Sequence, residues 1–180
     1  MDEKNKNAQE MGEEEVKGLI DLKKLDEAEA IIDQKLSRAE NDPTWLKNKG
    51  IIHAKKKEYE KAEEYFLLAL DHRPEDLTVV VNLGNIYLET GHPDAAENYY
   101  KQAISKDPSY DTPYYNLSAL YKKKGDYDRS KKFKKDYKRR YMEKRKNKKP
   151  ASSERKQYFS KEKVMIIVVI AILIALIFIR

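Results

Sequence analysis

The 180-residue sequence predicts an all-α protein, a solenoid of helical hairpins followed by a single C-terminal transmembrane helix. Three observations support this fold class. Amphipathic segments of roughly a dozen residues follow one another in pairs. Their pattern recurs every 34 residues, which is typical of a stacked repeat array. The last stretch, residues 164–179, is apolar without interruption.

The stretch Leu77–Tyr110 shows the repeating unit most clearly. It contains two amphipathic segments of helical spacing, separated by a short turn. In this turn Gly91 suits a left-handed residue after the first helix, and Pro93 suits the first turn of the second. Gly84 leaves room for the two helices to approach, and Tyr100 fills the volume beside it. One such hairpin cannot bury its own apolar faces, so we expect similar neighbours.

The neighbouring hairpins are recognised by residues that keep their type at each 34-residue step. A small-residue register and an apolar register illustrate this: Ala28, Ala62, Ala96 and Ser130, and Ile32, Phe66 and Tyr100. This period and pattern resemble the tetratricopeptide repeat, most closely over Pro43–Tyr110. The resemblance implies hairpins stacked into a right-handed superhelix, with the first helix of each hairpin lining the concave face.

Seven segments are expected along the chain. They are a polar leader (1–8), a degenerate repeat-like unit (9–42), two regular repeats (43–76 and 77–110), a degenerate repeat with an extended basic helix (111–144), a basic juxtamembrane linker (145–163) and the transmembrane helix (164–179). Helices are predicted near residues 13–23, 26–39, 44–56, 60–72, 78–90, 94–106, 112–124 and 128–147. The outer repeats are degenerate because one face of a terminal unit meets water.

A row of asparagines indicates where a partner binds. Asn48, Asn82 and Asn116 occupy the same place on successive first helices. In the family, an asparagine at this place often bonds to the backbone of an extended peptide, since a carboxamide offers both a donor and an acceptor. We therefore expect a partner-binding groove that also includes Lys47 and Asn85. The alternative is that these are polar groove residues of a common consensus.

The family's clamp for the C-terminal carboxylate of chaperones is not expected. Lys47 and Asn82 match two of its five places. At the other three, Ile51, Thr112 and Asn116 replace an asparagine, a lysine and an arginine. The loss of two cations weakens the capture of a terminal carboxylate.

Charge divides the chain into two parts of opposite sign. Met1–Ser130 holds 20 Lys and Arg against 27 Asp and Glu, whereas Lys131–Lys163 holds 16 against 4. In the basic part, Phe133, Tyr137 and Tyr141 recur every four residues as one aromatic stripe on a predicted helix. One interpretation is a closing helix whose stripe covers the end of the solenoid. The other is a helix that docks on anionic headgroups.

For the second interpretation, eight cations are expected at the membrane surface: Lys138, Arg139, Arg140, Lys144, Arg145, Lys146, Lys148 and Lys149. Cations interleaved with aromatic side chains also suit nucleic-acid phosphates. Membrane tethering of nucleic acid is therefore a further alternative, although no nucleic-acid-binding fold is recognisable in the sequence.

Residues 164–179 predict a C-terminal membrane anchor. As a helix, sixteen residues span about 24 Å, somewhat less than the roughly 30 Å hydrocarbon core, so flanking cations would reach the headgroups. The basic flank precedes the span, which favours repeats in the cytoplasm, and no N-terminal signal peptide is recognisable. This is a tail-anchored arrangement. The Lys- and Ile-rich composition favours a bacterial or archaeal cell membrane over an organelle membrane.

The sequence shows no constellation for catalysis, and we expect no enzyme, cofactor or metal. There is no cysteine, no glycine-rich phosphate loop and no metal-ligand spacing. The three histidines lie far apart in the repeat pattern, and His53 occupies the place of Tyr87 and Tyr121, which predicts a packing residue.

These observations predict a membrane-anchored tetratricopeptide-repeat adaptor or scaffold that binds a protein or peptide partner in its concave groove. The alternative is a structural assembly protein whose repeats self-associate on the membrane as a homo-oligomer. Self-association that persists without a partner distinguishes the second function from the first.

Overall fold

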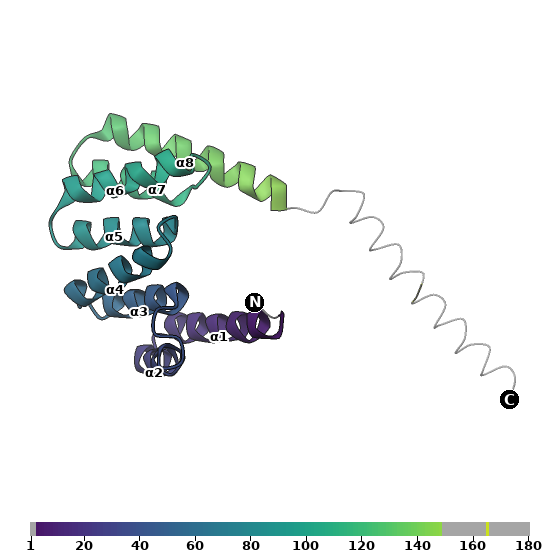
Figure 1. Ribbon diagram of the computed structural model, residues 1–180. Helices are drawn as coiled ribbons and strands as arrows, with labels where there is room; N and C mark the ends of the chain where they lie inside the picture. The colour runs from purple at the N-terminus through teal and green to yellow at the C-terminus, as the bar shows by residue number, and fades with distance from the viewer. Residues whose placement is uncertain (1–2, 149–164, 166–180) are drawn as a thin grey trace, which may run out of the picture. The chain divides into compact units, whose positions relative to one another are not determined.

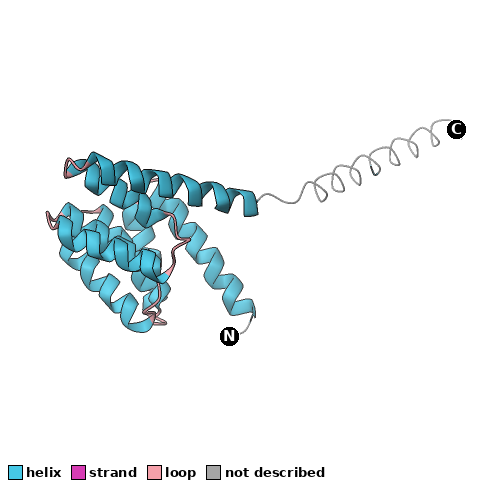
Figure 2. Ribbon diagram, turned by 90° about the horizontal axis from the view of Figure 1, so that it is seen from above, coloured by secondary structure: helices cyan, strands magenta, loops and turns pink. Residues whose placement is uncertain are grey.

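The computed structural model of the chain describes residues 3–148 and Met165. This part consists of helices and short connections (Figure 2). The helices are α1 (Glu3–Asp21), α2 (Leu25–Leu36), α3 (Pro43–Lys55), α4 (Tyr59–His72), α5 (Leu77–Glu89), α6 (Pro93–Lys106), α7 (Thr112–Lys123) and α8 (Tyr127–Lys148). The chain divides into two units, residues 1–137 and 138–180, and helices α1–α7 belong to the first.

Successive helices pair into hairpins, and each hairpin packs on the next (Figure 1). The most extensive contacts lie within the hairpins α3–α4 and α5–α6. Contacts between hairpins join α2 to α3, α4 to α5 and α6 to α7. The first helices also touch one another, α3 with α5 and α5 with α7. This is the arrangement that the 34-residue period predicts, so the all-α repeat fold is confirmed.

The predicted helix boundaries agree with the structure to within a few residues, with one exception. The first helix was expected from residue 13, but α1 begins at Glu3, so most of the expected polar leader is helical. Residues 3–15 are mostly Glu, Lys, Gln and Ala, which are good helix formers, and they contain no proline. An apolar periodicity, on which the prediction relied, starts only at Val16.

Each hairpin turn contains one residue with positive φ. Gly91 and Gly125 have φ of 84° and 76°, as expected for a helix that ends in the left-handed region. The two earlier turns place Lys23 and Lys57 there, with φ of 61° and 63°. A side chain makes this conformation unfavourable, so the first two turns hold backbone strain that the later two avoid.

Aspartates begin the first helices of the two regular repeats. The Asp42 carboxylate accepts a hydrogen bond from the Thr44 backbone N–H at 2.8 Å. The Asp76 carboxylate accepts from the N–H groups of Thr78 and Val79 at 3.0 and 3.3 Å. These contacts satisfy amides that have no partner inside the helix.

The apolar core forms three clusters, one after another along the stack. The first contains Ile32 and Trp45, the second Phe66 and Leu83, and the third Tyr100, Leu117 and Tyr121 with smaller residues around them. This distribution follows from the repeat architecture, in which each unit contacts only its neighbours.

No helix of residues 3–148 is long and apolar enough to cross a membrane. The predicted anchor, residues 164–179, lies outside the described residues apart from Met165.

Candidate functional site

The asparagine row, Asn48, Asn82 and Asn116, lies on the three first helices α3, α5 and α7, which are neighbours in the stack. All three residues are partly exposed. Among the described residues, no side chain forms a hydrogen bond with Asn48 or Asn82. Their carboxamides are therefore available to a ligand on the face that the first helices share.

Asn85 and Asn116 form a hydrogen-bonded pair between neighbouring repeats. The Asn85 Oδ1 accepts from the Asn116 Nδ2 at 2.9 Å and from the Tyr100 hydroxyl at 2.8 Å. Tyr100 is fully buried, and burial raises the pKa of its hydroxyl well above the usual range, so it remains a donor. Because the oxygen of the exposed Asn85 side chain already accepts two hydrogen bonds, its amide NH2 group is the part available to a ligand.

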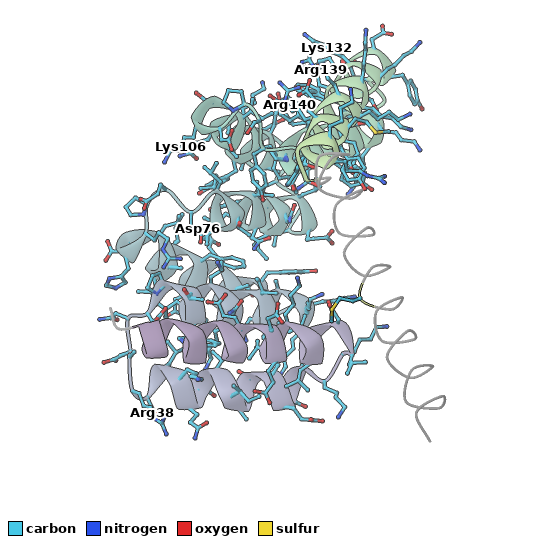
Figure 3. All side chains as sticks on the ribbon, turned by 90° about the vertical axis from the view of Figure 1, so that its right-hand side faces the viewer. Arg38, Asp76, Lys106, Lys132, Arg139 and Arg140 are labelled. Atoms are coloured by element: carbon cyan, nitrogen blue, oxygen red, sulfur yellow. The ribbon has the colours of Figure 1, made fainter. Side chains whose placement is uncertain are left out.

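Lys47, the fifth expected groove residue, forms an ion pair within the solenoid. Its Nζ lies 3.2 Å from the Asp76 carboxylate, which also caps α5, and both side chains are mostly buried. The structure therefore gives Lys47 a role in joining consecutive repeats. Figure 3 shows Asp76 at the connection between α4 and α5.

A recurring contact joins each second helix to the next first helix, which the sequence patterns above did not predict. The Tyr87 hydroxyl donates to Glu63 at 2.5 Å, and the Tyr121 hydroxyl donates to Glu97 at 2.5 Å. The His53 Nε2 lies 3.7 Å from the Glu29 carboxylate at the corresponding place. The signal was present, since the three glutamates are 34 residues apart and each directly follows an alanine of the small-residue register: Glu29, Glu63 and Glu97.

The same rings stack on an aromatic residue of their own hairpin. His53 stacks on Tyr65 with centroids 5.2 Å apart, and Tyr87 stacks on Tyr99 at 5.3 Å. His53 is 5% exposed, which confirms the prediction that it is a packing residue. In the last repeat Phe133 stacks on Tyr121 at 5.5 Å.

Lysines reinforce two of these inter-repeat contacts. Lys56 pairs with Glu29 at 2.7 Å, and Lys124 pairs with Glu97 at 3.1 Å and with Asp94 at 2.6 Å. Burial acts to raise the pKa of Glu97, but the hydrogen bonds that this carboxylate accepts outweigh burial and lower its pKa to about 2. Their donors are Lys101, Tyr121 and Lys124.

The first part of the aromatic stripe of α8 packs on α7, which is the first helix of the last hairpin. Phe133 packs on Tyr121, and Tyr137 lies 5.4 Å from Tyr115 between ring centroids. These two contacts support the closing-helix interpretation for the part of α8 in the first unit. Tyr141 belongs to the second unit, where the Arg145 guanidinium lies 5.9 Å from its ring.

Of the eight cations expected at a membrane surface, six have described side chains, and all of these are exposed or partly exposed: Lys138, Arg139, Arg140, Lys144, Arg145 and Lys146. The side chains of Lys148 and Lys149 lie outside the described residues. Figure 3 shows Lys132, Arg139 and Arg140 projecting from α8 among many other charged side chains.

Solved structures of similar fold were found by comparison. A crystal structure of MamA has 20% sequence identity and a TM-score of 0.63, over 76% of this chain and 80% of that chain. MamA from residue 41 to its end, from Desulfovibrio magneticus RS-1, has 18% identity and a TM-score of 0.59, over 78% and 77%. At these identities the likeness concerns the fold. The sequence has no significant match among curated proteins.

Two models of the tetratricopeptide-repeat family match the sequence, one over residues 42–109 and the other over residues 88–140. The fold that they describe is a scaffold for protein–protein interactions and is typically non-catalytic. Together the two matches span residues 42–140, more than half of the chain, and the chain belongs to the tetratricopeptide-repeat proteins.

Proposed function

We propose that this protein is a membrane-anchored adaptor that holds a protein or peptide partner in the groove lined by α3, α5 and α7. The observation that carries the proposal is the asparagine row, in which one partly exposed carboxamide from each of three neighbouring first helices occupies the same place in the repeat. A surface that repeats in this way suits a ligand that also repeats, such as an extended peptide backbone.

The chemistry of the row fits peptide groups rather than a charged end group. A carboxamide donates to a backbone carbonyl and accepts from a backbone N–H. Lys47, the one cation among the expected groove residues, is neutralised by Asp76. Affinity then comes from several modest hydrogen bonds along the groove, each of about 1 kcal/mol.

The membrane part of the proposal rests on the sequence. Residues 164–179 are uniformly apolar and follow a strongly basic stretch. With the basic flank on the cytoplasmic side, a helix of residues 164–179 would keep the repeats in the cytoplasm. The exposed cations of α8, together with residues 145–163, would contact anionic headgroups at that surface. The composition favours a bacterial or archaeal cell membrane.

A pull-down from native membranes tests the groove. The bait is the full-length protein, compared with a variant in which Asn48, Asn82 and Asn116 are all changed to alanine. A matched control changes Gln34, Asn98 and Gln102 to alanine, since these are three exposed carboxamides on second helices. Thermal melting confirms that both triple variants fold.

The adaptor function predicts one or more proteins that the wild type and the control capture and the asparagine variant does not. Recovery of the same proteins by all three baits, or of copies of the bait alone, contradicts the groove. Flotation of the full-length chain with vesicles, and its loss on deletion of residues 164–179, tests the anchor separately.

A further inference from the structure

A small pocket lies where the turn between α5 and α6 meets the C-terminal end of α7. It has a volume of about 320 Å³, and most of its lining is apolar. The residues around it are Leu88, Gly91, Pro93, Leu120, Lys123 and Lys124. Binding pockets for small organic groups begin at about this size, so the pocket is large enough for one aliphatic side chain.

The space depends on the small side chains of this turn. Gly91 has φ of 84° and carries no side chain, and a Cβ placed there would meet no atom within 4 Å. One repeat earlier, Lys57 and Tyr59 stand at the places of Gly91 and Pro93. Those two side chains are larger, so the earlier turn does not offer the same opening.

Two cations, Lys123 and Lys124, are among the residues that line the pocket. Lys124 is held by Asp94 and Glu97 at 2.6 and 3.1 Å. Lys123 is exposed, and among the described residues no carboxylate pairs with it. One repeat earlier the corresponding residue is Glu89, of opposite sign.

The pocket also continues the face that carries the proposed groove. Leu88 follows Asn85 by three residues on α5, and Leu120 follows Asn116 by four residues on α7. Helical residues at these spacings lie on the same side. The hydrogen bond between Asn85 and Asn116 brings the two helices together one turn before the pocket.

We infer that the pocket receives an aliphatic side chain of the bound peptide and that Lys123 pairs with an acidic side chain next to it. The inference rests on the proposed function, because it places the same extended peptide across the asparagine row and into the pocket. The apolar lining selects the aliphatic residue, and the unpaired cation selects the charge beside it.

The test is a selection from a random heptapeptide library with the full-length protein. The library is synthesised in two forms, with a free C-terminal carboxylate and with a C-terminal amide, and bound peptides are sequenced by mass spectrometry. We expect Leu, Ile or Val next to Asp or Glu to be enriched in both forms. Enrichment only among peptides with the free carboxylate assigns Lys123 to a chain terminus and overturns the side-chain pairing.

A charge reversal makes the test specific to Lys123. Peptides selected by Lys123→Glu should carry Lys or Arg, in place of the acidic residue, beside the aliphatic one. A peptide selected by the wild type should bind this variant about tenfold more weakly. Lys122→Glu is the matched control, because Lys122 is an exposed neighbour that does not line the pocket. This control should select the wild-type sequences. The same selection by Lys123→Glu and wild type, or the absence of any enriched pair, overturns the inference.

Repeating the selection with the triple asparagine variant separates the two proposals. Loss of all enrichment supports both. Peptides that still carry the aliphatic–acidic pair contradict the groove and support the pocket. A third outcome is that the wild type enriches other sequences, whose binding requires the three asparagines and does not change in Lys123→Glu. This outcome supports the groove and overturns the pocket.

Discussion

Gly84 on α5 receives the ring of Tyr100 from α6 so closely that a Cβ at residue 84 would lie 2.6 Å from a carbon of that ring. The preceding repeat has the same contact, with a Cβ at Gly50 placed 2.6 Å from two carbons of the Phe66 ring. The next repeat lacks it, because Ser118 replaces the glycine and Lys134 replaces the aromatic residue. The two regular repeats thus share a matched pair of a glycine and an aromatic residue at this crossing.

The first prediction concerns this crossing. Gly84→Ala should destabilise the protein by about 1–3 kcal/mol, because the Tyr100 ring is fully buried and bonded through its hydroxyl to Asn85, so it has little freedom to move. Urea denaturation measures the change. Gly18→Ala is the control: a Cβ there meets nothing within 4 Å, and alanine favours the helix, so stability should stay equal or rise. Equal behaviour of the two variants would contradict the packing account.

The second prediction concerns the left-handed turn residues. Lys57→Gly should stabilise the protein by about 1 kcal/mol, since glycine adopts the observed φ of 63° without steric cost. Gly91→Ala should destabilise it by a similar amount for the opposite reason. Thermal melting of both variants gives the sign. Lys122→Gly, inside α7, serves as the control and should destabilise, because there the glycine only adds flexibility to the unfolded chain.

The third prediction concerns stability at acid pH. The pKa of Glu97 is about 2 in the folded protein and 4.5 in the reference state. Since the folded value is the lower one, the contribution of Glu97 is fully present above pH 4.5 and is lost as pH falls towards 2. It amounts to on the order of 2 kcal/mol.

Glu97→Gln should therefore lower stability at pH 7 and flatten its decline between pH 4.5 and 2, as measured by urea denaturation at several pH values. Glu64→Gln is the control, since Glu64 is exposed and forms no ion pair among the described residues. A decline in Glu97→Gln as steep as in the wild type would refute the assignment.

The fourth prediction compares two helix caps. Asp42→Ala removes a side-chain cap from one N–H and should cost about 1 kcal/mol. Asp76→Ala removes a cap from two N–H groups and also leaves Lys47 without its partner, so it should cost about 2 kcal/mol. Denaturation midpoints of the two variants test the ranking. A larger loss in Asp42→Ala than in Asp76→Ala would contradict this ranking.

Local sequence patterns were sufficient to predict the secondary structure and its repetition. Apolar residues at helical spacing located the helices, and glycine and proline located the turns, because these signals act within a few residues of the chain. The left-handed conformation of Gly91 and the packing of the Tyr100 ring against Gly84 could be predicted for the same reason. The early start of α1 could not, because helix propensity without an apolar stripe gives no periodic signal.

The contacts between polar residues depend on how the helices pack in three dimensions. Ser118 and Ser130 each donate a hydrogen bond to the backbone carbonyl of the other, at 3.0 and 2.8 Å, and so join α7 to α8 where the glycine–aromatic contact is missing. Lys47 looked like a groove residue in the sequence, yet it pairs with Asp76, 29 residues later in the chain. The sequence around Lys47 or Asp76 gives no sign that these two residues form a contact.

The candidate site shows the same division. The sequence placed Asn48, Asn82 and Asn116 on one face, because a 34-residue step returns to the same position of each hairpin. The contact between Asn85 and Asn116, and the pocket that Leu120 helps to line, form only when the hairpins stack. Contacts between repeats depend on how one hairpin packs on the next. That packing follows from the shapes of whole side chains on both hairpins, which the sequence pattern of either one does not give.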